Sequence, residues 1–279
     1  MSKNLSAAAQ QEFDSLVHHL YQGMGRLRDC CQLRSGVTGD IYKFRTMGKG
    51  VANQKPTQAD VTPMDIDHTL VNCILENWVA PEYTDIFDQA EVNFDEKSQL
   101  AKTISKALGR REDQLLIDAL DGAGSYLATV GTATGGSNRM NIGKIRAAGE
   151  ELDQQEVDED GRIMILSARS KWSMLEDPEL SSSDYNTVKA LANGEINTYA
   201  GFTFKFIGTR SEGGLTSASN VFDGYAYHKD ALGLAIGIDQ KTEVNYVPEK
   251  TSWLCNGLLK AGAVAIDTTG LVKVQATET

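Results

Sequence analysis

The sequence has few of the residues on which enzyme active sites and disulfide frameworks usually depend. Its 279 residues include only four histidines, four cysteines and five prolines. No apolar run approaches the roughly 18 residues that a membrane-spanning helix needs. The start of the chain has no cationic stretch followed by an apolar block, as a secretory signal would have. We therefore expect a chain that is made and kept in the cytoplasm and does not contact a membrane.

The cysteines do not form a pattern that would suggest disulfide bonds. Cys30 and Cys31 are adjacent and cannot easily bridge each other, while Cys73 and Cys255 stand alone in strand-like segments. Isolated cysteines in apolar surroundings are usually buried free thiols. We predict four free thiols.

The charge of the chain is strongly negative, with a formal net charge of -11 at pH 7. This balance argues against a protein whose main task is to grip nucleic acid through phosphate contacts. The fractions of hydrophobic residues (41%) and charged residues (23%) are those of an ordinary globular protein. The length allows one large or two medium domains.

The motifs of common catalytic sites are missing. Gly143 and Lys144 are followed by Ile145, so the phosphate loop lacks its serine or threonine, and neither a dinucleotide fingerprint nor a nucleophile elbow is present. The stretch 156–163 imitates a calcium loop, but position twelve is Ser167 where a bidentate carboxylate is needed. We interpret it as an acidic, solvated turn.

The few histidines give no further site. Asp65, Asp67 and His68 have a spacing that could serve a divalent metal, but no second histidine or cysteine lies nearby in sequence. His228 beside Lys229 and Asp230 is interpreted as a residue at the edge of the core. We therefore predict no catalytic residue, no cofactor and no metal.

The amino-terminal part of the chain predicts an amphipathic helix over residues 8–28. Five apolar side chains fall on one stripe at alternating spacings of four and three: Phe13, Val17, Leu20, Met24 and Leu27. Such an arm must pack on something. The pattern leaves open whether that is the core of its own subunit or a neighbouring subunit.

Residues 35–80 predict a long hairpin. One strand covers 41–45, with Tyr42 and Phe44 on one side, and a second runs from 69 to 79 until Pro81 ends it. The tip between them, residues 46–62, is polar and interrupted by glycine and proline. A loop this long is usually functional or awaits a partner.

A long helix follows, and then a region in which helices and strands alternate. Asn93 and Glu96 resemble a capping box, Gly109 is a weak point in the helix, and Gly122 with Gly124 ends it. The further predicted helices are 142–152 (begun by Asn141), 172–175 and 184–193. The predicted strands are 163–167, 201–207, a fully buried 231–238, a half-buried strand up to 247, and 253–265 with 271–274, which meet across a turn at 267–270. The fold class is α+β.

Three stretches, taken in order with this architecture, resemble the major capsid proteins of tailed bacteriophages, podovirus-like members of the Hong-Kong-type capsid fold. They are VNFDEKSQLAKTISKALGRREDQLLIDAL (92–120), RIMILSARSKWSMLEDPEL (162–180) and YAYHKDALGLAIG (225–237). The resemblance implies five parts: an N-terminal arm (1–35), an extended hairpin (36–80), a peripheral domain with a spine helix (81–137), an axial domain (138–238) and C-terminal strands that return to the peripheral domain (239–279).

The function that this resemblance implies is a non-enzymatic virion protein, assembled in the host cytoplasm. It would self-assemble as hexamers and pentamers into an icosahedral shell around double-stranded DNA, bound without sequence specificity. The implied partners are other copies of the chain, a portal protein, a separate scaffolding protein and, in some relatives, a cement protein. Two alternatives remain, an encapsulin-like compartment of the same fold and a soluble α/β hydrolase or transferase with a noncanonical site.

The resemblance also suggests where subunits meet. The candidate interface residues are the arm stripe Phe13, Val17, Leu20, Met24 and Leu27, the hairpin residues Tyr42, Arg45 and Lys49, and Arg110 with Arg111 at the weak point of the helix. Some family members crosslink subunits through lysine and asparagine, and Lys49 and Lys55 lie in the corresponding hairpin tip. Exposed lysines are common in loops, so we do not expect crosslinking from their position alone.

Overall fold

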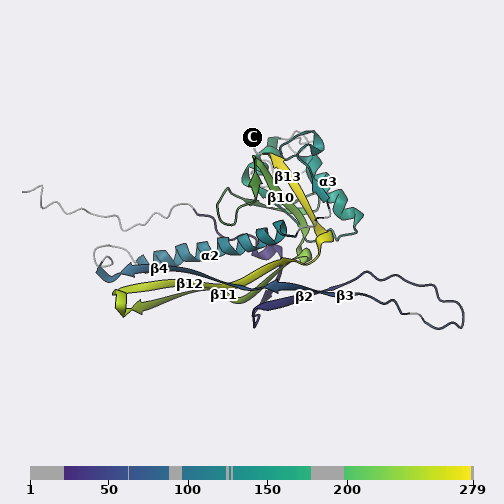
Figure 1. The fold of residues 1–279 in the computed structure, drawn as a ribbon. Coiled ribbons are helices and arrows are strands. Elements are labelled where there is room, and N and C mark those ends of the chain that lie inside the picture. The colour runs from purple at the N-terminus through teal and green to yellow at the C-terminus, as the bar shows by residue number, and fades with distance from the viewer. Residues whose placement is uncertain are drawn as a thin grey trace, which may run out of the picture.

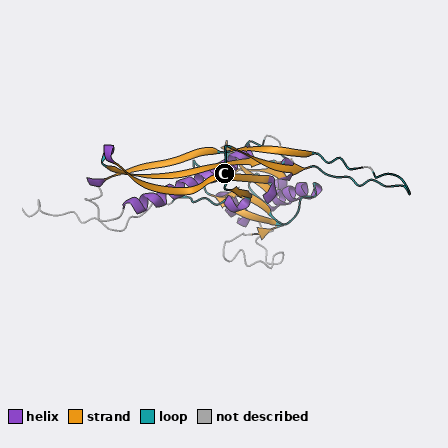
Figure 2. Ribbon diagram, turned by 90° about the horizontal axis from the view of Figure 1, so that it is seen from below, coloured by secondary structure: helices purple, strands orange, loops and turns teal. Residues whose placement is uncertain are grey.

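A long four-stranded sheet, a seven-stranded sheet and a projecting two-stranded hairpin make up the structure, a computed structural model (Figure 1). The structure describes residues 22–61, 63–87, 96–123, 126, 128–176 and 198–277. Figure 2 shows that the long sheet and the hairpin extend the molecule in one direction, while the seven-stranded sheet lies beside the middle of that axis.

The long sheet has the strand order β1 (Gln32–Ser35), β11 (Leu232–Val247), β12 (Ser252–Ala265) and β4 (Glu76–Asp85). Helix α2 (Glu96–Asp121) lies along one face of it. Alternate residues of β12, among them Cys255 and Leu259, are buried against Ile104 and Leu108 of the helix. Gly257 allows the close approach, because a Cβ there would lie 2.3 Å from Cγ2 of Ile104.

The seven-stranded sheet has the order β5 (Ala128–Val130), β13 (Leu271–Thr277), β10 (Val221–His228), β6 (Arg162–Ser167), β8 (Phe202–Ile207) and β7 (Thr198–Tyr199), with β9 (Ser217–Ala218) paired to β10. Helices α3 (Ile142–Gln154) and α4 (Ala168–Glu176) belong to this unit. Its core gathers apolar side chains from α3, β6, β8 and β13. A second core joins the other face of the sheet to α2 and β11.

The hairpin consists of β2 (Ile41–Met47) and β3 (His68–Ile74). Its base packs on β11 through Phe44, Cys73 and Ala235. Short 3-10 helices complete the described elements: η2 (Arg28–Cys30), η3 (Thr134–Gly136), η4 (Lys229–Ala231), η5 (Pro248–Lys250) and η6 (Thr268–Gly270).

Much of the predicted secondary structure is confirmed, as is the α+β class. Helix α3 begins after Asn141, whose side chain accepts a hydrogen bond from the backbone N–H of Lys144 at 3.0 Å. The strand predicted over 201–207, with Phe202, Phe204 and Phe206 on one face, is confirmed as β8: Phe202 and Phe204 are buried, and Phe206 packs partly buried against the same core. Helix α2 runs without a break through Gly109. The four cysteines are buried free thiols.

Four predictions on the described residues are wrong. Residues 22–27 are not helical and only 28–30 form a 3-10 turn. The strand predicted over 69–79 is two strands that change sheet at Leu75. Pro81 lies inside β4, opposite Asn256, because β4 is an edge strand on which the missing N–H can point away from the sheet. Finally, β12 and β13 are not a hairpin, since they belong to different sheets.

Other predictions fall outside the described residues, namely the capping box at Asn93, the glycine stop at Gly124 and the helix over 184–193. The division of the chain into five parts stays a prediction. Strand β11 crosses the predicted boundary at residue 238, and β13 joins the seven-stranded sheet. Strand β10 was not predicted, because its mixture of glycine, alanine and tyrosine has no clear alternation.

Candidate assembly surfaces

The hairpin has one covered and one uncovered face. Tyr42 and Phe44 point toward the core at its base, and their rings meet edge to face with centroids 4.9 Å apart. On the opposite face four large apolar side chains are exposed, namely Ile41, Met47, Leu70 and Ile74. Exposed apolar side chains gathered on one strand pair are typical of a surface that contacts a partner.

The loop at the tip of the hairpin has little support from its own chain. Among its described residues, 48–61 and 63–67, nearly all are exposed. One backbone hydrogen bond closes its base, from the N–H of Gly48 to the carbonyl of Asp67 at 2.8 Å, and a second joins Ala59 to Pro56 at 3.3 Å. Lys49 and Lys55 are both exposed here. The loop reaches away from the rest of the structure (Figure 1).

The face of the long sheet that points away from α2 is covered in one half only. In the half near the seven-stranded sheet, the hairpin base packs over Ala235 and Val264. In the far half, Val79 and Tyr83 of β4 are 62% and 43% exposed, beside the partly buried Leu258 and Leu254 of β12. An apolar strip therefore remains without a partner on the far half.

The chain segment before β1 is anchored by one buried carboxylate. Asp113, on α2, accepts hydrogen bonds from the backbone N–H groups of Arg26 and Leu27 at 2.9 Å, and its Oδ2 lies 2.6 Å from Nη2 of Arg210. Next to it, a Cβ on Gly25 would lie 2.7 Å from the carbonyl oxygen of Gly109. Asp113 thus ties residues 26–28, which we call the arm root, to α2 and to the loop after β8.

A second polar cluster joins the same root to β11. Arg28 donates two hydrogen bonds of 2.8 Å to the carboxylate of Asp239, and this contact lowers the pKa of Asp239. Glu112 is buried, and its Oε2 accepts a hydrogen bond from Gln240 at 2.9 Å. Burial raises the pKa of Glu112, in spite of the positive charge of Arg28 at 3.6 Å.

The predicted interface residues lie in different environments. Phe13, Val17 and Leu20 are outside the described residues; Met24 is exposed, whereas Leu27 is completely buried against α2. Arg45 is exposed on the outer face of the hairpin. Arg110 donates to the carbonyl of Gly23, and Arg111 stacks on Trp78 at 3.5 Å from the ring centroid. Both arginines are therefore engaged within the subunit. Their role between subunits stays a prediction.

The residues considered for chemistry are used structurally. His228 lies with Nε2 2.8 Å from the carbonyl oxygen of Asp160, while its Nδ1 accepts from the N–H of Asp230, so that both ring nitrogens are engaged. In the acidic turn, the guanidinium of Arg162 donates to the carbonyls of Val157 and Asp158. The same guanidinium pairs with the carboxylate of Asp153 at 2.7 Å, so Arg162 holds the turn together. The described residues contain no cluster of three or more potential metal ligands.

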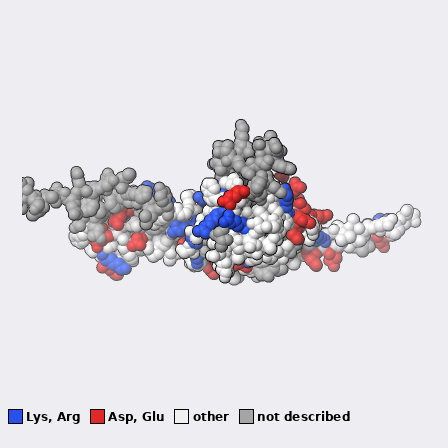
Figure 3. Space-filling model, turned by 90° about the horizontal axis from the view of Figure 1, so that it is seen from above, with Lys and Arg blue, Asp and Glu red and all other residues white. Residues whose placement is uncertain are grey.

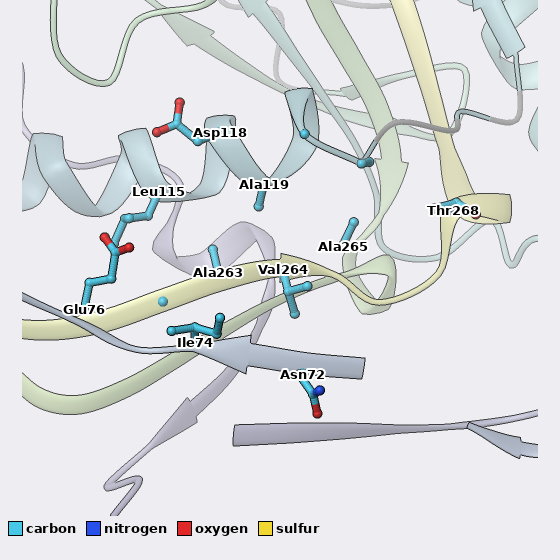
Figure 4. A pocket seen from close by; sticks show the side chains of 13 residues that line it. Asn72, Ile74, Glu76, Leu115, Asp118, Ala119, Ala263, Val264, Ala265 and Thr268 are labelled. Carbon is cyan, nitrogen blue, oxygen red and sulfur yellow. The ribbon is translucent and has the colours of Figure 1, made fainter. Parts of the chain in front are cut away.

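The pocket drawn in Figure 4 also lacks the parts of a catalytic site. A pocket of about 590 Å³ lies between the C-terminal half of α2, the junction of β3 with β4, and β12. Figure 4 shows Ala119 of α2 on one side of it and Ala263 and Ala265 of β12 on the other. Its charged lining residues are Glu76 and Asp118, and Asp118 points away from β12 (Figure 4). Among the described residues that line it there is no histidine, cysteine, serine or lysine.

Comparison with known families identifies this architecture. A sequence model of the phage capsid protein family matches residues 5–278. The chain belongs to the phage capsid protein family. It is therefore a major capsid protein, located in the virion as a subunit of an icosahedral shell. The match favours this capsid role over the encapsulin-like compartment and the hydrolase or transferase considered from the sequence.

Solved structures agree on the fold of this capsid protein. The capsid of cyanophage P-SCSP1u matches with a TM-score of 0.77 and 15% identity, covering 100% of this chain and 96% of the other. A chain from Mycobacterium phage Che8 matches with a TM-score of 0.72 and 16% identity, covering 95% and 96%. The head of Helicobacter pylori bacteriophage KHP40 matches with 0.74 and 9%, covering 100% and 98%.

No curated protein sequence matches the chain. Among the helices in the described part, none is long and apolar enough to cross a membrane. The similarity to the solved capsids therefore lies in the three-dimensional arrangement, at low sequence identity.

Two residues of these surfaces were not predicted from the sequence, namely the buried carboxylates Glu112 and Asp113. Their one signal in the sequence is a pair of adjacent acidic residues within a helix.

Proposed function

We propose that this capsid protein assembles as hexamers and pentamers, and that the hairpin of one copy covers the far half of the long sheet of the next. The observation that carries the proposal is the half-covered sheet. The base of a subunit's own hairpin covers the near half, while Val79 and Tyr83 on the far half are exposed.

The two uncovered faces belong to different parts of the subunit, so a contact between them is heterologous. A contact of this kind joins each copy head to tail with the next, and it closes into a ring when the rotation between copies allows. Apolar area on both sides, at about 25 cal/mol per Å² removed from water, supplies the driving force. Ile41 and Ile74, among others, supply exposed apolar area on the hairpin, and Val79 and Tyr83 supply it on the sheet.

The contents and helpers of the shell are part of the same proposal. We infer that the shell encloses double-stranded DNA, that it forms in the host cytoplasm with a separate scaffolding protein and a portal, and that a cement protein is optional. The negative net charge of the chain suits a wall that encloses DNA without adhering to it. Charge is unevenly placed, with lysine and arginine gathered mid-face and acidic groups near the base of the hairpin (Figure 3). A non-enzymatic role accords with the structural use of His228 and Arg162.

A pair of matched substitutions tests the contact. Val79→Lys places a charge on the uncovered far half of the sheet, whereas Val244→Lys places one on β11, opposite Cys255 and therefore on the α2 side of the sheet. We expect V79K to sediment as a folded, unassembled subunit and V244K to form capsomers or shells, with scaffold added if needed. Normal assembly of V79K would refute the proposed contact. A wild-type chain that stays monomeric with scaffold would refute the shell-forming role itself.

A further inference from the structure

An exposed tryptophan stands out on the seven-stranded unit. The chain has three tryptophans. The rings of Trp78 and Trp253 are covered by Arg111 and Lys97, with cations at 3.5 and 3.8 Å from the ring centroids. Trp172 of α4 is 63% exposed, and the nearest cation to its ring, Lys171, is at 5.8 Å. The side chain is therefore available to a partner.

Trp172 forms one wall of a surface pocket of about 530 Å³. Phe206 at the end of β8 also lines the pocket. The charged residues that line it are all cationic, namely Arg26, Lys171 and Arg210. Arg210 is paired with Asp113, but Arg26 and Lys171 have no carboxylate partner among the described residues. An occupant of this pocket should thus combine apolar side chains with negative charge.

The rim of the pocket is formed by the first described residues of the chain, Gln22 and Gly23. The segment that ends at this rim, residues 4–21, contains Glu12 and Asp14 and no lysine or arginine. It also carries the apolar stripe of Phe13, Val17 and Leu20. Leu20 is separated from Gln22 by one residue, so the stripe can reach the pocket without a spacer.

We propose that residues 12–20 dock in the Trp172 pocket of their own subunit. The apolar stripe packs on Trp172 and Phe206, and the carboxylate of Asp14 faces the ammonium group of Lys171. Attachment at the rim gives the segment a high effective concentration at its own pocket, which favours this contact over the same contact made by a second copy. The pocket thereby sets the direction in which the arm leaves the subunit.

Hydrogen exchange on the full-length, unassembled subunit tests this contact. We expect the backbone amides of residues 12–20 to exchange about tenfold more slowly in the wild type than in Trp172→Ala. Lys171→Glu should remove part of the protection, and adding Asp14→Lys to K171E should restore it. Lys229→Glu, a charge reversal at an exposed lysine outside the pocket, serves as the matched control and should exchange like the wild type.

Equal exchange in the wild type and in W172A would overturn the proposal. Protection that disappears on tenfold dilution would also overturn it, because the occupant would then be a second copy. Trp172 is exposed and Lys171 only partly buried, so circular dichroism should show that W172A and K171E are folded. Because the two variants remove different contacts, a loss of protection in both cannot come from one folding defect. The inference does not rest on the shell, whose formation is measured separately by sedimentation.

Discussion

Replacing the buried Asp113 should destabilise the subunit more than replacing any exposed carboxylate of α2. The side chain is 1% exposed and holds three groups at once: the amides of Arg26 and Leu27 and the guanidinium of Arg210. Asp113→Ala removes all of these acceptors. It also leaves the mostly buried Arg210, whose side chain is 14% exposed, without its partner.

The size of the effect follows from that environment. Breaking a buried ion pair by removing one partner costs about 3 to 5 kcal/mol, because a charge stays buried without compensation. Asp113→Asn keeps one oxygen for the two amides and should cost less, about 2 kcal/mol, close to one lost hydrogen bond to a charged group. Asp118→Ala is the control on the same helix, since Asp118 is exposed and bonds only to Gln114 in the described structure. It should change the free energy of unfolding by less than about 0.5 kcal/mol.

Urea unfolding of the unassembled subunit, followed by tryptophan fluorescence, measures these differences. The expected order of midpoints is wild type close to D118A, then D113N, then D113A, with similar slopes. A D113A subunit within about 1 kcal/mol of the wild type would refute the reasoning. It would mean that the arm root and Arg210 are held by other contacts.

Three further predictions concern the core. Burial lowers the pKa of Lys144 to about 8, below its ordinary 10.5. The unfolded chain therefore binds more protons than the folded chain between these values, and the free energy of unfolding should rise with pH from about 8 to 10.5. Lys144→Met should abolish that rise in urea titrations at several pH values, and the same rise in this variant as in the wild type would contradict the prediction. Gly262→Ala should lower the free energy of unfolding by about 2 to 3 kcal/mol, because a Cβ there would lie 1.9 Å from the carbonyl oxygen of Ile74. Gly131→Ala, whose Cβ would have no atom within 4 Å, is the control and should be nearly neutral when thermal melts of the two variants are compared with the wild type. Burial raises the pKa of Cys73 to about 11, so its thiol carries almost no reactive thiolate at pH 8. A disulfide reagent at this pH should therefore modify Cys73 only in urea, and rapid modification of Cys73 in the native subunit would contradict the prediction.

The parts of the fold that depend on residues close together in the sequence could be predicted. The Asn141 cap and the alternation of Phe202 with Phe204 are local, and both are confirmed. The arm root could not be predicted in this way, because the carboxylate of Asp113, far away in sequence, holds the amides of Arg26 and Leu27. That contact competes with the helix that the apolar spacing favours.

Predictions that depend on the neighbours of a strand were less successful. The turn at 267–270 has the composition of a hairpin turn, yet it leads from β12 in one sheet to β13 in the other, because the core between the sheets decides the pairing. The interface residues show the same limit. The sequence suggested that Arg110 and Arg111 are available to a neighbouring subunit. In the structure Arg110 donates a hydrogen bond to the carbonyl of Gly23, and Arg111 stacks on Trp78.

The weakly supported loop at the tip of the hairpin has a consequence for the concentration at which shells form. Ordering its backbone against a neighbour costs conformational entropy, about 1 to 2 kcal/mol for each residue fixed. Each 1.4 kcal/mol that is saved per contact lowers the critical subunit concentration about tenfold. A proline at a position of the loop with compatible backbone angles recovers about 0.4 to 1 kcal/mol. If the loop orders on a neighbouring copy as proposed, the composition of residues 48–67 thus adjusts the subunit concentration at which assembly begins.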